Sequence, residues 1–337
     1  MSTYIAPMLM PAPDAVAVRR RKAPWWRWGL SLVGVGLLVW VVARLDPEKM
    51  LAVLAQLPAT ALFGAAVSFT VNLVLKTVRW RRLLDAEGIH LGWGEALASY
   101  LVGAFYGSVT VGRVGEFMRI DVLLARSVPF GRALAASLFD RVEDLATLAL
   151  VGAASAAWLA GRAALAWGLV LAGVGGVLVS MVSGRLLGSW SGLATPRTVS
   201  SGRMGRLVYH LRVLAGEAPT LLRPAVLMES LVWTAVTWAA YCGTVWFLAR
   251  GLIGDVPLLY LVAAPAISAL ATLLPVTYQG IGVRELVFAT VLGHAGVERE
   301  HAVVLSMSMF AVMFVVSVAW GLAAMAVRRF DARTLPR

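Results

Sequence analysis

Cysteine and histidine are scarce in this 337-residue sequence. The single cysteine, Cys242, cannot form a disulfide within the chain, and its place in an apolar segment indicates a small buried residue, not a reactive thiol. The four histidines lie far apart, without the spacing of metal ligands. The glycine run GVGG at 173–176 lacks the strand–turn–helix setting of a nucleotide-binding loop. We therefore expect neither a metal site nor another cofactor.

Charged residues are also scarce. Charged residues make up 14% of the chain, whereas soluble domains contain about a quarter. The apolar share of 60% and the mean hydropathy of +0.79 predict a polytopic membrane protein. Acidic residues are fewer than basic residues, and the net charge is +12. Such an excess of positive charge is typical of cytoplasmic loops near anionic lipids. Binding of a nucleic acid would need a basic soluble domain, so we expect no nucleic-acid partner.

Long apolar runs are abundant, and six of them reach the roughly 20 residues that a membrane-spanning helix needs. They lie near 26–44, 59–77, 133–159, 163–184, 225–249 and 303–327. The Pro- and Ala-rich residues before them, which end in an arginine cluster, predict a disordered basic cytoplasmic tail over 1–24. We expect an all-α membrane helical bundle over residues 25–330 and a short cytoplasmic tail over 331–337.

Two further apolar regions, near 95–127 and 257–293, are interrupted by glycine. Each is predicted to form two short helices joined by a Gly-rich turn. The second halves span about 12 residues, or roughly 18 Å, too short to cross about 30 Å of hydrocarbon. The two regions also resemble each other when Glu116 is aligned with Glu285, since each glutamate follows a Val-Thr pair and a run of glycines. Interrupted segments at corresponding places in two halves indicate a transporter binding site.

The distribution of positive charge favours re-entrant hairpins for both regions. If each region crossed the membrane once, the 185–223 loop, with six arginines and Glu217, would lie outside the cytoplasm, against the positive-inside rule. If each enters and leaves on one side, that loop, the 76–95 loop and both termini are cytoplasmic. We therefore predict six full spans plus two re-entrant hairpins that form an inverted repeat, in a bacterial-type inner or plasma membrane.

Charged residues and glycines gather in the two broken regions, where a charge is costly and marks function. In the first region they are Arg113, Glu116 and Arg119 with Gly112 and Gly115; in the second they are Arg284 and Glu285 with Gly280 and Gly282. The glycines permit tight turns and close backbone approach. We expect both sets to meet at a polar cavity near the bilayer midplane, where the helix N-termini present N–H groups to an anion.

A third charged cluster, DRVED at 140–144, lies inside the span that begins near 133. Asp140, Glu143 and Asp144 share one face of the predicted helix, and Arg141 lies about a quarter-turn away. Acids inside a span need partners. The expected partners are Arg113, Arg119 and Arg284. Such pairing can serve only to hold helices together, or the arginines can bind the phosphate of an anionic lipid, and the charges alone leave both interpretations open.

Three motifs follow one another along the chain: GEFMR at 115–119, DRVEDL at 140–145 and QGIGVREL at 279–286. With these residues the sequence resembles the lysylphosphatidylglycerol synthase transmembrane-region family, flippase-like membrane proteins related to the N-terminal part of multiple peptide resistance factor. The similarity covers nearly the whole chain after about residue 25. Two departures from the family pattern are Asp140, in place of glutamate, and TYQGIG, in place of a turn richer in proline and glycine.

The resemblance implies a stand-alone protein that moves a lipid or lipid-linked headgroup between leaflets, with the arginines above on the headgroup phosphate. The family's aminoacyl-transferring synthase is a separate C-terminal domain, so we expect this chain to be no enzyme. Membrane lipids and a separate lipid-modifying enzyme are the partners it implies, and self-association of the chain stays open.

Two other functions remain open. An integral-membrane glycosyltransferase with a lipid-phosphate donor is supported by the acidic pair in DPE at 46–48. A structural or regulatory protein of a lipid pathway would need the buried charges only for folding.

Overall fold

The computed structural model describes residues 47–190, 220–273 and 280–334, and every regular element in these ranges is a helix. The predicted tail at 1–24 and the predicted span at 26–44 lie outside the described residues. Helix α12 continues to Thr334, so part of the predicted tail at 331–337 is helical.

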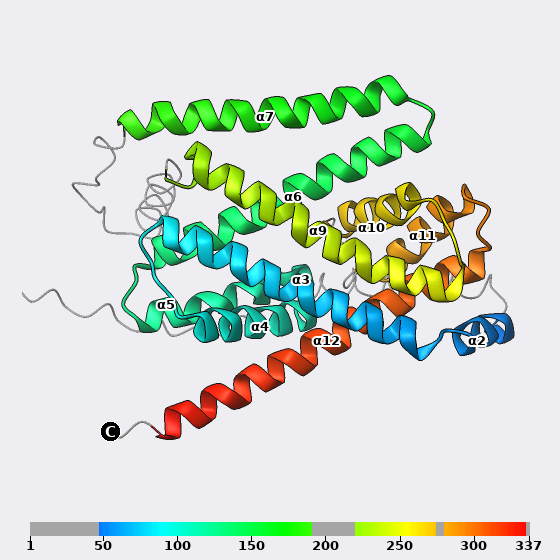
Figure 1. Ribbon diagram of the computed structural model, residues 1–337, viewed down its shortest axis with the longest axis horizontal. Helices are drawn as coiled ribbons and strands as arrows, with labels where there is room; N and C mark the ends of the chain where they lie inside the picture. The colour runs from blue at the N-terminus through cyan, green and yellow to red at the C-terminus, as the bar shows by residue number, and fades with distance from the viewer. Residues whose placement is uncertain (1–46, 191–219, 274–279, 335–337) are drawn as a thin grey trace, which may run out of the picture.

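Five long helices form the bundle (Figure 1). They are α3 (Ala59–Ala86), α6 (Phe130–Leu159), α7 (Ala163–Trp190), α9 (Pro224–Leu252) and α12 (Arg299–Thr334). Each contains a segment that is long and apolar enough to cross a membrane. They coincide with five of the six predicted spans, and the prediction of an all-helical membrane protein is confirmed.

Shorter helices occupy the two broken regions. The first holds α4 (Trp93–Val109), the 3-10 helix η1 (Val111–Ile120) and α5 (Asp121–Ala125); the second holds α10 (Leu258–Leu273) and α11 (Val283–Gly293). In Figure 1, α4 and α5 lie in the left-hand part of the bundle, and α10 and α11 lie in the right-hand part. A further short helix, α2 (Pro47–Ala55), precedes α3, between the predicted spans at 26–44 and 59–77.

The returning arm of the first region differs from its prediction. A Gly-rich turn followed by one short helix was expected, but the glycines lie within η1, and only five residues of α5 follow. A 3-10 helix rises about 2 Å per residue and is narrower than an α-helix, so η1 covers more length and approaches α4 more closely than a short α-helix would.

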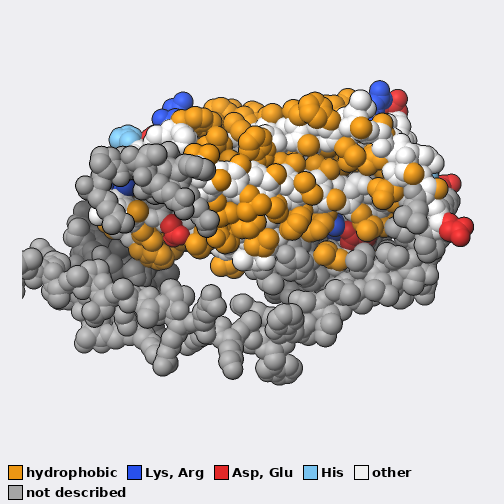
Figure 2. Space-filling view, turned by 90° about the horizontal axis from the view of Figure 1, so that it is seen from below, with side chains coloured by type: hydrophobic (Ala, Val, Ile, Leu, Met, Phe, Trp, Pro, Cys, Tyr) orange, Lys and Arg blue, Asp and Glu red, His pale blue; other side chains and the backbone are white. Residues whose placement is uncertain are grey.

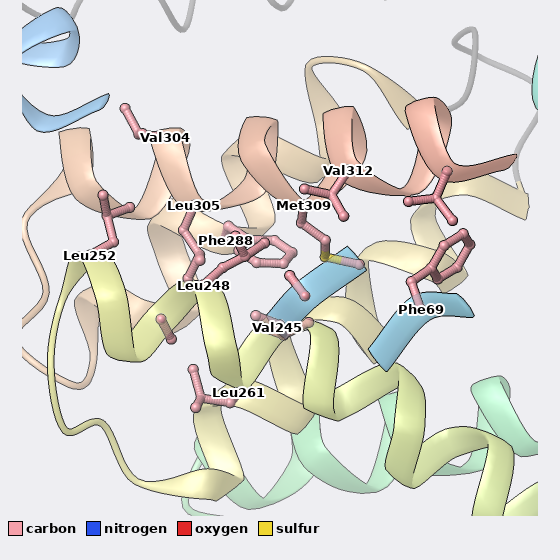
Figure 3. Packing of buried hydrophobic residues seen from close by; sticks show 14 of the residues in the cluster. Phe69, Val245, Leu248, Leu252, Leu261, Phe288, Val304, Leu305, Met309 and Val312 are labelled. Carbon is pink, nitrogen blue, oxygen red and sulfur yellow. The ribbon is translucent and has the colours of Figure 1, made fainter. Parts of the chain in front are cut away.

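The core lies where α3, α9, α11 and α12 meet. Phe288 of α11 is fully buried among Leu248, Leu305 and Met309 (Figure 3). Small residues allow the helices to approach: a Cβ atom added to Gly243 of α9 would lie 2.5 Å from the Ser68 hydroxyl of α3. Because lipid is as apolar as the core, such close packing, and not burial of an apolar stripe, holds helices together in a membrane.

The outer surface is apolar over its middle. Figure 2 shows hydrophobic side chains across the face that it views, with most of the visible charged side chains toward its two ends. Helix α7 packs along α6 and otherwise exposes large apolar side chains, among them Leu171 and Val179. In a bilayer such a surface faces lipid acyl chains.

Candidate functional site

The returning arm η1 lies directly on the backbone of α4. A Cβ atom added to Gly103 would lie 2.8 Å from the carbonyl oxygen of Glu116, and one added to Gly107 would lie 2.4 Å from Glu116 Cγ. Conversely, a Cβ atom on Gly115 of η1 would lie 2.3 Å from the carbonyl oxygen of Tyr106. The G-x-x-x-G spacing of α4 therefore provides the seat for η1. Gly112 is the second residue of η1.

An ion pair joins the two ends of the α4–η1–α5 segment. Arg126, just after α5, lies 2.5 Å from a carboxylate oxygen of Glu95 in the first turn of α4. The same guanidinium donates to the carbonyl oxygen of His90 at 3.3 Å. The segment therefore begins and ends at the same end of the bundle, with η1 running back along α4.

Arg113 marks the tip of this segment. Its backbone φ is +57°, in the left-handed region that non-glycine residues rarely adopt, and this conformation costs about 1–3 kcal/mol. The Nε atom of Arg113 lies 2.6 Å from Glu116 Oε1. The other oxygen of Glu116 binds Arg141 of α6 at 2.9 Å. Glu116 thus pairs with two guanidinium groups, that of Arg113 from η1 itself and that of Arg141 from α6.

Arg79 of α3 is the centre of a second set of ion pairs and is fully buried. It lies 2.7 Å from a carboxylate oxygen of Asp140 and 2.7 Å from one of Asp144, both on α6. Its Nη1 also donates to the Thr234 hydroxyl of α9 at 2.7 Å. Asp144 in turn binds Lys76, one turn before Arg79, at 2.6 Å. Three helices therefore meet at one buried guanidinium.

Arg119 connects η1 to this centre. Its guanidinium binds the other oxygen of Asp140 at 2.8 Å and donates to the carbonyl oxygen of Ser137 at 3.0 Å. It also lies over two aromatic rings, 5.2 Å from the centroid of Trp80 and 5.0 Å from that of Tyr100. Cation–π contacts of this kind stabilise a desolvated guanidinium. Arg119 therefore fixes η1 against α3 and α6.

Two cavities, of about 60 and 110 Å³, adjoin these ion pairs. Four residues line both cavities: Asn72, Lys76, Arg113 and Tyr241. The larger cavity is also lined by Arg141 and Asp144 and by the apolar residues Leu145, Leu148 and Trp238. The arrangement can hold an anion beside lysine and arginine while presenting apolar surface next to it.

The charges of the second broken region form a cluster of their own. Glu285 accepts a hydrogen bond from the backbone N–H of Gly282 at 2.6 Å and pairs with Arg284 at 2.5 Å. Ser306 of α12 lies within hydrogen-bond distance of both side chains. The backbone φ angles of Gly280 and Gly282 are +75° and +88°, which require glycine. Residues 274–279 lie outside the described ranges.

One expectation about this second cluster is wrong. The N-terminus of α11 was expected to offer N–H groups to an anion, but the carboxylate of Glu285 caps it, because a glutamate three residues after the N-cap residue can fold back onto that N–H group. Among the described residues, neither Arg284 nor Glu285 lines the two cavities above, and the cavity that both regions were expected to share stays a prediction.

Three arginines were predicted to pair with the acids of DRVED, and the prediction is confirmed for one of them and wrong for the other two. Arg119 binds Asp140. Arg113 and Arg284 instead pair with glutamates close to them in sequence, three residues away and one residue away. Short sequence separation makes such local pairs easy to form.

Sequence reasoning missed Lys76 and Arg79 because it ended the second span at residue 77 and assigned 76–95 to a cytoplasmic loop. That boundary is wrong, since α3 continues to Ala86. Buried acids on α6 compensate the two cations, so the charges do not end the span. The sequence does contain a signal: Lys76 and Arg79 are three residues apart and share one helix face, and the acids that they bind, Asp140 and Asp144, are four residues apart and also share a face.

Metal ligation has no support in the part of the chain that the structure describes, where no group of three or more His, Cys, Asp or Glu side chains is placed to hold an ion. The carboxylates of the site bind lysine and arginine instead.

Comparison with known proteins gives two matches. One is to glycosyltransferase AglD of Haloferax volcanii, 29% identical over 144 residues. The match covers 37% of this chain and 22% of AglD, so the chain spans less than a quarter of that protein's length. The other is to a protein-family model described as the lysylphosphatidylglycerol synthase TM region, which matches residues 27–321. This match includes both broken regions and every ion pair described above. The chain therefore belongs to the lysylphosphatidylglycerol synthase TM region family.

Proposed function

We propose that this protein moves a lipid with an anionic, phosphate-bearing headgroup between the leaflets of a membrane. The observation that carries the proposal is the placement of Lys76 and Arg113 on the walls of both cavities. The proposal assigns no aminoacyl transfer to the chain, so a separate enzyme would modify the lipid that it moves.

The charge balance of the site supports an anionic substrate. Five cations take part in the ion pairs around the cavities: Lys76, Arg79, Arg113, Arg119 and Arg141. Three carboxylates pair with them: Glu116, Asp140 and Asp144. Two positive charges are therefore in excess. Arginine binds phosphate oxygens with two N–H groups at once, so this excess suits a phosphodiester headgroup.

The size and lining of the cavities support a lipid whose headgroup enters the bundle while its chains stay outside. A volume of about 110 Å³ holds a small polar group and not a whole lipid. Leu145, Leu148 and Trp238 give the larger cavity part of its lining. Acyl chains would lie against these apolar residues while the phosphate lies beside Lys76 and Arg113.

We also propose six full spans and two re-entrant hairpins that enter from opposite faces, with both termini cytoplasmic. The pairing of Arg126 with Glu95 supports the first hairpin, since it brings the two ends together. The positions of α4–α5 and α10–α11 at opposite ends of the bundle support the inverted arrangement (Figure 1). The arginine-rich 185–223 loop and the C-terminus would then lie on the cytoplasmic side of a bacterial-type inner membrane.

Reconstitution tests this function. Purified protein in vesicles that contain a fluorescent phosphatidylglycerol should expose the inner-leaflet probe to a membrane-impermeant quencher faster than empty vesicles do. Lys76→Met and Arg113→Ala should each lower that rate about tenfold, the loss expected for one charge-assisted contact of about 1.4 kcal/mol. Arg82→Ala is the matched control, because Arg82 is an exposed cation of α3. Equal rates for wild-type and empty vesicles would contradict the proposal.

A membrane glycosyltransferase is the second candidate, and the match to AglD is the observation that favours it. Of the DPE acids, Glu48 is exposed at the start of α2, and Asp46 lies outside the described residues. This function requires that a lipid-linked glycan disappears when Asp46→Asn or Glu48→Gln replaces the wild type in cells. Unchanged glycans in both variants would exclude a role for this acidic pair.

A further inference from the structure

Glu143 differs from the other acids around the cavities. It lies on α6 between Asp140 and Asp144 and is 7% exposed. One carboxylate oxygen accepts a short hydrogen bond from the Ser230 hydroxyl of α9, and the Thr234 hydroxyl lies beside the carboxylate. The other oxygen has no partner at ordinary hydrogen-bond geometry. Among the described residues no cation pairs with it. An ionised carboxylate in this position would cost several kcal/mol, whereas a protonated carboxyl costs far less.

Four groups act directly on Glu143: Arg79 of α3, Asp140 of α6, and Ser230 and Thr234 of α9. The other charged residues of the cluster already have partners: Lys76 pairs with Asp144, Arg119 with Asp140, Arg141 with Glu116, and Glu229 of α9 with Arg82. Helix α10 has no charged residue over Leu258–Leu273, and α7 has none over Ala163–Ser183. Every neighbouring carboxylate already has a cation as its partner, so Glu143 is the acid of this group whose charge is uncompensated.

Two residues of α9 link Glu143 to Arg79. Ser230 and Thr234 are one helical turn apart; the first binds Glu143 and the second binds Arg79. If Glu143 lost its proton, its carboxylate would attract Arg79, which is now shared between Asp140 and Asp144. Asp144 would then be left to Lys76, the lysine on the walls of both cavities. Ionisation of Glu143 would also lower the positive excess of the site from two charges to one.

We propose that Glu143 is a proton-binding site linked to the occupancy of the cavities by an anionic headgroup. The proposal rests on the transport function above and supplies its coupling ion. Headgroup binding favours the protonated form of Glu143, in which a proton taken from water forms an O–H bond on the carboxylate; after the headgroup leaves, Glu143 binds that proton less tightly and can return it to water. Linkage is reciprocal, so the proton strengthens headgroup binding by the same factor by which the headgroup strengthens proton binding.

Infrared difference spectroscopy tests the proton site without transport. Protein in nanodiscs is titrated with pH, in the presence and absence of phosphatidylglycerol, and the carbonyl band of protonated carboxyl groups is followed. One component should be missing in Glu143→Gln, present in the control Glu229→Gln, and should persist to higher pH when phosphatidylglycerol is added. A spectrum that Glu143→Gln leaves unchanged, or a titration that phosphatidylglycerol does not move, would overturn the proposal.

Transport against a pH gradient tests the linkage. With one proton per lipid, the ratio of probe between the leaflets should change by up to about tenfold per pH unit, since one unit corresponds to a tenfold ratio. Glu143→Gln, which mimics the protonated form, should still move lipid but ignore the gradient, and Glu143→Asp should keep a response. A wild-type ratio that ignores the gradient, or a Glu143→Gln ratio that follows it, would overturn the linkage. Absence of any lipid movement in wild type would instead contradict the transport function, and the spectroscopic titration would still decide the proton site.

Discussion

Asp140 binds Arg119 with 2.8 Å between carboxylate and guanidinium, and this pair attaches η1 to α6. The same carboxylate also binds Arg79 of α3. One side chain therefore fixes three elements of the bundle around the cavities, and its loss should be felt in stability before it is felt in transport.

Replacing Asp140 by asparagine should lower the free energy of unfolding by about 3–5 kcal/mol, because two buried guanidinium groups lose a charged partner. Unfolding in detergent, followed by tryptophan fluorescence, measures this loss. The control is Glu229→Gln, which breaks the exposed pair with Arg82 and should cost about 0–1 kcal/mol. Equal stability of the two variants would show that the Asp140 pairs contribute no more than a surface pair.

A methyl group on Gly107 should displace Glu116, since the added Cβ would lie 2.4 Å from Glu116 Cγ. Gly107→Ala is therefore expected to cost about 1–3 kcal/mol by overpacking and to disturb the pairs with Arg113 and Arg141. The control is Gly175→Ala in α7, where the new methyl group meets no atom within 4 Å. That change should be neutral or stabilising by up to about 1 kcal/mol, because alanine favours the helix. Thermal unfolding and lipid movement are compared for both variants.

Arg113 allows its backbone and its side chain to be tested separately. Arg113→Gly and Arg113→Ala both remove the guanidinium, and both should slow lipid movement. Glycine adopts the φ of +57° without strain, whereas alanine does not. The glycine variant should therefore be more stable than the alanine variant by about 1 kcal/mol. Alanine being the more stable of the two would indicate that the tip relaxes to another backbone conformation.

Glu285→Gln should affect folding more than headgroup binding. The substitution leaves the buried guanidinium of Arg284 without a carboxylate and weakens the cap on Gly282, at an expected cost of about 3–5 kcal/mol. Because Glu285 does not line the two cavities, the affinity of folded protein for phosphatidylglycerol should stay within about threefold of wild type. Thermal unfolding and binding to lipid nanodiscs are the two measurements. A large loss of affinity in folded protein would place Glu285 at the headgroup.

The helices and the site were predictable from sequence to different degrees. Five spans followed from length and hydropathy alone, because a bilayer imposes a minimum apolar length. The end of α3 did not, since Lys76 and Arg79 look like the edge of a span until their partners on α6 are known. That Gly103 and Gly107 seat η1 also depends on a contact between segments, which a helix-packing motif alone does not specify.

Sequence identified several charged residues of the site but not which of them pair with each other. A charge inside a span indicates function or a buried partner, and this singled out Arg113, Arg119 and Asp140. Several arginines and several acids then allow many pairings, and one sequence does not rank them. Arg284 shows the difficulty: its carboxylate partner is the next residue in the chain, which lies on the same turn and needs no other helix.

The pair between Arg126 and Glu95 joins the two ends of the segment from α4 to α5, and the pairs of Arg119 and Glu116 with α6 hold its middle. Gly88 precedes this segment and Ser127 follows it, with φ angles of +72° and +60°. Any displacement of the segment relative to α6 therefore has to separate two ion pairs first. Arg113, whose own partner Glu116 belongs to one of these pairs, would move only together with that change.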